Sequence, residues 1–283
     1  MSSSVQTGDY RHASWWQLSL VFLLALLLFV ALHWQPEPWL RSQMVSQSQQ
    51  QGIELDFNSL NVEGFSVRID GASIRAAAIS TPVTFETLTL EPAWSSLLTG
   101  TIAVRLIASW QGHQGQAVLA LQENHLDISD IHAAVDAAAL QSIWQGAVAM
   151  PLNVSGQVQV SGRLRLLANT VHPVQGQLTT LWQAAAVDLA GMTMSLGDYQ
   201  LMVQSEEGAA DSWPWTLTGG TAVLLNGKGA VHTAGSAVQG WAMSGQAQAE
   251  AGEQAAGLAA MLGTAPMKFR LSGSVTQPRL ERL

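Results

Sequence analysis

The sequence predicts a mainly β protein, in which an N-terminal transmembrane helix is followed by a meandering, mostly antiparallel curved sheet with two short helices. Three observations predict this class: an uncharged apolar segment near the N-terminus, alternation of apolar and polar residues along most of the remaining chain, and 25 glycines that punctuate this alternation. Segments with helical apolar spacing are few. The pattern therefore excludes a doubly wound α/β fold, in which helices and strands alternate.

Charged residues are scarce along the whole chain. They make up 11% of it, against 48% apolar residues, whereas a soluble domain carries about 25% charged residues. The twelve basic residues are scattered and the net charge is −8, which excludes a nucleic-acid partner because no basic field is available for the phosphates. The absence of cysteine excludes a disulfide scaffold, a zinc ribbon and a thiol nucleophile.

Residues 15–34 are predicted to form a single transmembrane helix. No charge occurs between Leu18 and Leu32, and 20 residues of helix span about 30 Å, which matches the hydrocarbon core of a bilayer. Trp15 and Trp16 at one end and Trp34 at the other take positions that aromatic rings favour at the interface. A cleaved signal peptide is the alternative. The long apolar run and the lack of a small-residue cleavage site favour an uncleaved anchor.

The orientation of the anchor follows from size rather than from charge. Arg11 precedes the span and Arg41 follows it, so the positive-inside count is a tie. Residues 1–14 form a short tail, whereas roughly 249 residues follow the span, and a long downstream domain is translocated largely regardless of charge. We therefore expect a cytoplasmic N-terminus and a C-terminal domain outside the membrane.

Beyond the anchor the sequence divides into a linker and two β regions. Residues 35–51 contain Pro36 and Pro38 and then a polar segment, 40–51, which reads as a short helix or a linker. An N-terminal β region over 52–140 and a C-terminal β region over 141–283 follow. Period-two alternation predicts strands at 53–57, 65–69, 85–90, 102–106, 154–166, 176–189, 198–205, 215–225, 229–234, 238–250 and 268–275.

The clearest alternation runs over residues 154–166. Every even position is apolar or glycine and every odd position is polar, which excludes a helix. Extended, this segment spans about 43 Å, as one long strand or as two strands joined at a glycine. If it lies at a sheet edge, it is a possible partner-facing strand, although a core strand has the same pattern; its apolar residues are Val154, Val158, Val160, Leu164 and Leu166.

Three local patterns predict breaks in the strands. Residues 131–144 and 253–262 are alanine-rich with helical apolar spacing and predict the two short helices. Asn226 and Gly227 predict the tip of a β-hairpin, because Asn-Gly is the preferred pair of a type I′ turn. The same segment continues with Lys228 and Gly229, but the glycine spacing and the Ser or Thr of a phosphate loop are missing.

No catalytic, cofactor-binding or metal site is expected. On a strand, Glu123, His125 and Asp127 would share one face, with Asp130 and His132 nearby, so three types of metal ligand would converge. The favoured interpretation is a solvated strand edge that leads into the helix near residue 131, with Asp130 as its N-cap. An enzyme that uses this cluster is the weakest of the functional hypotheses. Seven further tryptophans favour sheet packing over a partner surface: Trp94, Trp110, Trp144, Trp182, Trp213, Trp215 and Trp241.

Several segments resemble the type II secretion system protein N family. They are, in order, 151–158 (PLNVSGQV), 176–185 (GQLTTLWQAA), 196–201 (LGDYQL), Gly219-Gly220 with Asn226-Gly227, and 255–262 leading to 269–275 (FRLSGSV). Residues 85–106 (FETLTLEPAWSSLLTGTIAVRL) are instead similar to AsmA-like envelope proteins, in which a strand leads through a Ser-Leu-Leu-x-Gly turn to a further strand. Residues 111–135 have no counterpart in either pattern.

The resemblance implies a non-enzymatic component of a type II secretion machine, anchored in the bacterial inner membrane and facing the periplasm. Its partners would be other subunits of the machine and the phospholipid bilayer. The AsmA-like segment implies an alternative, in which an open apolar sheet face binds or transfers lipid. Removing residues 1–34 leaves 30 charges in 249 residues, about 12%, so we expect the second face of the sheet to be partly covered by a partner, by lipid or by its own curl.

Overall fold

The structure is a computed structural model that describes residues 37–50, 53–76, 82–97, 100–144, 153–167, 172–189, 192–205, 211–233, 241–252, 266–275 and 277–283. The chain divides into two units, Met1–Ser42 and Gln43–Leu283, and the whole sheet belongs to the second. The predicted anchor over 15–34 and the predicted helix over 253–262 lie outside the described residues. No helix in the described part of the chain is long and apolar enough to cross a membrane.

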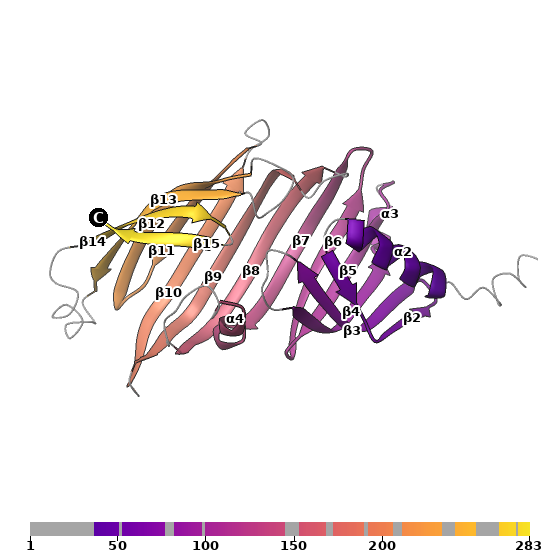
Figure 1. Cartoon of the computed structure of the whole chain (residues 1–283), viewed down its shortest axis with the longest axis horizontal. Helices are drawn as coiled ribbons and strands as arrows, with labels where there is room; N and C mark the ends of the chain where they lie inside the picture. The colour runs from indigo at the N-terminus through magenta and orange to yellow at the C-terminus, as the bar shows by residue number, and fades with distance from the viewer. Residues whose placement is uncertain are drawn as a thin grey trace, which may run out of the picture. The chain divides into compact units, whose positions relative to one another are not determined.

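One antiparallel sheet contains all fifteen described strands, and neighbours in the sheet are almost always neighbours in the sequence (Figure 1). Only the first strands depart from this order, because β1 and β2 both pair with β3. The strands are β1 Ile53–Asp56, β2 Ser59–Glu63, β3 Ser66–Ala76, β4 Val83–Pro92, β5 Ala103–Trp110, β6 His113–Leu121, β7 His125–Asp136, β8 Asn153–Leu167, β9 Pro173–Leu189, β10 Met192–Ser205, β11 Ser212–Gly219, β12 Val223–His232, β13 Ala242–Ala251, β14 Met267–Ser274 and β15 Gln277–Arg282. The prediction of a mainly β, meandering antiparallel sheet is confirmed.

Three short helices accompany the sheet within the described residues: α2 Glu37–Gln50, α3 Trp94–Leu97 and α4 Ala137–Trp144. Of the segment 40–51, which the sequence left open between helix and linker, residues 40–50 lie in helix α2. The helix predicted from residue 131 begins six residues late, because residues 131–136 continue β7. In this stretch Ile131, Ala133 and Val135 alternate with polar or smaller residues and pair with β8, so strand pairing prevails over the helical spacing of the alanines.

Strand β8 is one continuous strand, which decides between the two alternatives for residues 154–166. It pairs with β7 along one edge and with β9 along the other. Its backbone hydrogen bonds are therefore used inside the sheet, and the hypothesis of a free edge for a partner strand is wrong for this segment. Because β7 and β8 pair, the two β regions expected to meet at residue 140 share one sheet.

The hairpin predicted at Asn226 and Gly227 is also wrong. Both residues lie within β12, which pairs with β11 on one side and β13 on the other. The chain turns earlier, at Gly219 and Gly220, whose φ angles of 128° and 94° suit glycine. The strand predicted over 215–225 is therefore two strands joined by this turn.

Strands β6 and β7 fill the region for which the family resemblance offered no counterpart. The hairpin from β5 to β6 turns at Gln111 and Gly112, which both have positive φ angles, 49° and 78°. Strand β7 contains a bulge at Asp130, where φ is 49° and the register to β8 shifts between Ile128 and Ile131. The predicted N-cap role of Asp130 is thus wrong, because Asp136 is the residue that precedes α4.

Buried apolar side chains are few for so large a sheet. Among the described residues, nine apolar side chains larger than alanine are buried, and they are Phe57, Leu60, Ile69, Val158, Val187, Tyr199, Trp213, Trp215 and Val231. The first three lie in or beside β2 and β3, and the last three form a cluster on β11 and β12. The sheet is therefore not sealed by a second layer of described residues over most of its strands.

Candidate functional site: an apolar sheet face

The strand register separates the side chains into an apolar face and a polar face. Residues that pair across antiparallel strands lie on the same face, and neighbours along a strand lie on opposite faces. One cross-strand row runs from β2 to β14 and is apolar or glycine at twelve of its thirteen positions: Leu60, Ile69, Leu88, Ala108, Gly115, Ala133, Val160, Thr180, Leu201, Leu217, Gly227, Ala247 and Phe269. We call the side that carries this row the apolar face.

The adjacent row, on the opposite side, is polar at eleven of thirteen positions. It comprises Asn61, Arg68, Thr89, Ile107, Gln116, His132, Ser161, Thr179, Met202, Thr216, Lys228, Gln246 and Arg270. A shallow hollow of about 730 Å³ extends over β5 to β10 and is lined by Gln116, His132, Ser161 and Thr179 of this row, by other glutamines, and by apolar residues that include Ile107 and Leu181. Amide and hydroxyl groups thus supply most of the polarity of this face, in keeping with the low charge of the chain.

The apolar face is only partly shielded from solvent. Leu60 and Ile69 are each 1% exposed, whereas the eleven other members of the apolar row are partly exposed. An apolar surface that crosses so many strands is larger than the isolated apolar residues found on ordinary protein surfaces. Extended apolar surfaces of this kind are typical of places where proteins bind other molecules.

A tryptophan cluster lies on the apolar face near the C-terminal end of the sheet. Trp213, Trp215 and Val231 are buried, with exposures of 4%, 5% and 9%. Partly buried apolar side chains pack against them from several strands and the adjoining segments: Leu164, Leu201, Val203, Leu217, Trp241, Met243, Leu271 and Val275. The cluster therefore joins β8 to β14 through side chains of one face.

Glycines on the neighbouring strands make room for the indole of Trp215. A Cβ atom built on Gly245 would lie 2.3 Å from Cζ2 of the indole, and one built on Gly229 would lie 2.7 Å from Cε2. At Gly227 the corresponding distance, to Cζ3, is 3.1 Å. The flat ring thus lies over strands β12 and β13 where they have no side chains, and its Nε1 donates a hydrogen bond to the carbonyl of Ser244 at 3.3 Å.

Two other indoles of this cluster have no hydrogen-bond partner. The Nε1 atoms of Trp213 and Trp241 are buried, and no acceptor meets them in the described part of the chain. Buried N–H groups are nearly always paired in folded proteins, and each unpaired one costs about 1–3 kcal/mol. The apolar cluster thus contains two donors that its own residues do not satisfy.

Tyr199 and Trp182 form a second aromatic pair on the apolar face, with ring centroids 5.8 Å apart. The Tyr199 hydroxyl donates to the carbonyl of Val223 at 2.9 Å, and Nε1 of Trp182 donates to the carbonyl of Ser155 at 3.0 Å. Burial raises the pKa of the Tyr199 hydroxyl above its ordinary value. Both polar groups are satisfied, so this pair has a structural role.

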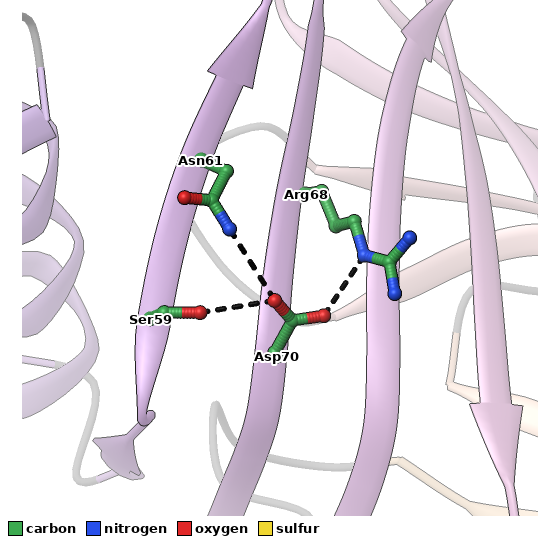
Figure 2. A network of polar contacts seen from close by, with 4 residues as sticks. All are labelled: Ser59, Asn61, Arg68 and Asp70. Carbon is green, nitrogen blue, oxygen red and sulfur yellow. Dashed lines mark hydrogen bonds and ion pairs between the residues drawn. The ribbon is translucent and has the colours of Figure 1, made fainter.

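A polar network on the opposite face stabilises the pairing of β2 with β3 (Figure 2). Asp70 accepts hydrogen bonds from Nε of Arg68 at 2.9 Å, from the hydroxyl of Ser59 at 2.9 Å and from the amide of Asn61 at 3.4 Å. The hydrogen bond from Arg68, followed by that from Ser59, lowers the pKa of the Asp70 carboxyl. The Asp70 carboxylate thus binds three neighbouring side chains of β2 and β3.

No three of the described acidic and histidine residues between 123 and 132 lie close enough together to hold one metal ion. Glu123 precedes β7, so it does not share the strand with His125 and Asp127. The Asp127 carboxylate is held by Arg165, with Nε–Oδ1 and Nη2–Oδ2 distances of 2.6 and 3.3 Å. No group of three potential metal ligands occurs among the residues whose positions are described.

Sequence reasoning placed the apolar alternation of β8 correctly but missed the tryptophan cluster. Four of the five predicted residues, Val154, Val158, Val160 and Leu164, pair through β9 with residues of the same face, and Leu164 packs against the cluster. The fifth, Leu166, pairs with Leu126 in β7 and, beyond a register shift, with Pro173 in β9. Alternating glycines at 227 and 229, with Gly245 in the next strand, are the signal that a large flat side chain lies above them.

Comparison with known proteins gives no relative for this chain: no family model, no curated protein and no solved structure matches it.

Proposed function

We propose that the chain is a non-enzymatic component of a type II protein secretion system, anchored in the bacterial inner membrane through residues 15–34, with its sheet in the periplasm. Two lines of reasoning support this proposal. The glycine-punctuated segments between residues 151 and 275 resemble the protein N family of these machines. The sheet, moreover, carries a continuous apolar row from β2 to β14 that another subunit would cover.

The partly exposed apolar row is the observation that carries the proposal. A row of thirteen positions with one polar member has a clear energetic preference for burial, at about 25 cal/mol for each Å² of apolar surface removed from water. Apart from the strands, the described part of the chain contains only three short helices. Contact with another subunit of the machine gives the face a cover and gives the protein its role, which is connective rather than catalytic.

Neighbouring residues on β8 provide a matched test. Val160 lies on the apolar face and Ser161 on the polar face. A photo-crosslinking amino acid placed at position 160 of the full-length protein in living cells should capture a secretion subunit, whereas the same group at position 161 should not. Deleting the gene should impair the export of secreted enzymes. Unchanged export after deletion would contradict the proposal.

Binding of acyl chains along the apolar face is a second candidate function. It is favoured by the mixture of apolar side chains and unsatisfied indole donors in the tryptophan cluster, because an acyl lipid combines a long apolar chain with oxygen acceptors. Native mass spectrometry of the full chain released from membranes should then detect bound lipid. Normal export combined with a failing outer-membrane barrier, after gene deletion, would favour this function over secretion.

A further inference from the structure

The tryptophan cluster contains three indoles whose nitrogen atoms differ in one respect. Nε1 of Trp215 donates to the carbonyl of Ser244, whereas Nε1 of Trp213 and Nε1 of Trp241 are buried and have no acceptor among the described residues. Trp213 is only 4% exposed. The cluster thus combines an apolar surface with two donors that lack an acceptor, and the Trp215 donor serves as an internal reference.

A buried water molecule is a poor acceptor for these two N–H groups at this position. Such a water typically makes about three hydrogen bonds to polar groups. Eight partly buried apolar side chains pack against Trp213, Trp215 and Val231. The buried polar side chains of the described residues are Ser205 and Thr233, and the Ser205 hydroxyl already donates to the Ser212 carbonyl. Because the eight apolar side chains offer a water no acceptor, an oxygen carried in by an apolar molecule fits this surface better.

We propose that the Trp213 and Trp241 indoles bind the ester carbonyl of an acyl lipid whose hydrocarbon chain lies on the apolar face. This inference rests on the second candidate function, acyl-chain binding. A neutral carbonyl is favoured over a free carboxylate, because the cluster contains no cation and a buried unpaired carboxylate is far more costly than a hydrogen-bonded neutral oxygen.

Access to the two nitrogen atoms requires side chains to move. Both atoms are covered by their neighbours, and Met243 is among the partly buried residues that pack against the cluster. Its unbranched thioether chain has three rotatable bonds and adapts readily to a new neighbour. The acyl chain then continues from the cluster along Leu201 and Leu217 of the apolar row.

The test compares two probes that differ only in the methyl ester group, which supplies the carbonyl. Methyl 9,10-dibromostearate carries an ester, whereas 9,10-dibromooctadecane does not, and bromine quenches tryptophan fluorescence in both. Binding is measured with the full-length chain in one detergent, so that partitioning of each probe into the micelle is the same for every variant. The quantity of interest is the ratio of the two dissociation constants.

We expect the wild-type chain to bind the ester about tenfold more tightly than the hydrocarbon, and Trp213→Phe or Trp241→Phe to reduce this preference about threefold to tenfold, since each removes one donor of about 0.5–1.5 kcal/mol. Trp215→Phe and Trp182→Phe are matched controls, because their N–H groups already donate to Ser244 and Ser155. Both controls should keep the ester preference, and the second lies outside the cluster in case the first variant does not fold.

Each outcome separates the inference from the function on which it rests. Equal affinity of the wild type for ester and hydrocarbon overturns the carbonyl site but leaves acyl-chain binding in place. Loss of the preference in the Trp182→Phe control as well as in Trp213→Phe also overturns the site. Absence of quenching by either probe overturns both the site and acyl-chain binding, whereas export defects in the deletion strain would still support the secretion role.

Discussion

Substituting Gly245 by alanine should displace the indole of Trp215 from its position over β12 and β13. The new Cβ atom would lie 2.3 Å from Cζ2 of the indole and 2.8 Å from the carbonyl oxygen of Lys228, and both distances are shorter than van der Waals contact. Trp215 is 5% exposed and packed on all sides. The ring therefore cannot move without disturbing its neighbours.

The expected loss of stability follows from three contributions. Overpacking a core by one methyl group costs about 1–3 kcal/mol, and losing the hydrogen bond from Trp215 to the Ser244 carbonyl costs about 0.5–1.5 kcal/mol. Alanine restricts the unfolded chain and returns about 0.4–1 kcal/mol. We therefore expect Gly245→Ala to lower the free energy of unfolding by about 2 kcal/mol.

Gly227→Ala is the matched control, because Gly227 lies under the same indole at a distance that nearly fits a methyl group. Its built Cβ is 3.1 Å from Cζ3 of Trp215 and 3.3 Å from Cβ of Ala247, so small shifts accommodate it. Its effect should be within about 1 kcal/mol in either direction. Urea unfolding of the full-length chain, followed by circular dichroism and by tryptophan fluorescence, measures both variants. A Gly245→Ala variant as stable as Gly227→Ala would refute the packing of Trp215 over these glycines.

Three further substitutions test polar contacts of the sheet. Tyr199→Phe should lower the free energy of unfolding by about 1 kcal/mol, because it removes the hydrogen bond to the Val223 carbonyl. Since burial raises the pKa of this hydroxyl, the stabilisation is complete below the unfolded pKa of about 10 and is lost as the pH rises through the folded value; identical alkaline melting of variant and wild type would contradict this. Asp127→Asn should cost no more than about 1 kcal/mol in urea unfolding at neutral pH, because its ion pair with Arg165 is partly exposed, and a larger loss would show a further role. The lowered pKa of Asp70 predicts stabilisation above the unfolded pKa that is lost as the pH falls through the folded value, so Asp70→Asn should flatten the acid limb of the stability profile below about pH 4; an unchanged acid limb would refute it.

The long alternating segments could be predicted because their signal is local. Strand β8 keeps a strict period of two from residue 154 to residue 166, and the even positions of this segment fall on the apolar face. The side-chain period of a strand is fixed by backbone geometry, so the sequence alone indicates both the strand and its two faces. The neighbours of the strand carry no such local signal, which is why its interior position in the sheet could not be predicted.

The prediction of a hairpin at Asn226 and Gly227 is wrong because a glycine at position 227 has two possible physical reasons. A type I′ turn requires glycine for its positive φ angle, whereas in β12 Gly227 lies under the indole of Trp215 beside Gly229, where a Cβ atom would lie 2.7 Å from Cε2 of the ring. The second cause depends on a residue in another strand. Only the tertiary contact distinguishes the two.

The bulge in β7 escaped prediction for a related reason. Asp130 has a φ of 49°, and the register shift beside it lets Ile128 and Ile131 both face β8 on the apolar side. Aspartate tolerates this conformation better than most residues, but aspartate is also a common N-cap. Since the alanines that follow suit either a strand or a helix, the decision came from pairing with β8.

The apolar row and the polar row of the sheet show how the low number of charged residues affects binding. The polar row meets solvent at Gln116, Thr216 and Gln246, which are exposed although they are uncharged, so this face needs no cover. The apolar row, in contrast, is partly exposed along most of its length while its glycines and alanines keep the surface smooth. A strongly charged polar face would repel or attract partners over long distances. The polar face of this sheet carries few charges, so its long-range attraction and repulsion are weak. Association of the chain should therefore depend on burial of the apolar face and only weakly on salt, whether the cover is a secretion subunit or an acyl lipid.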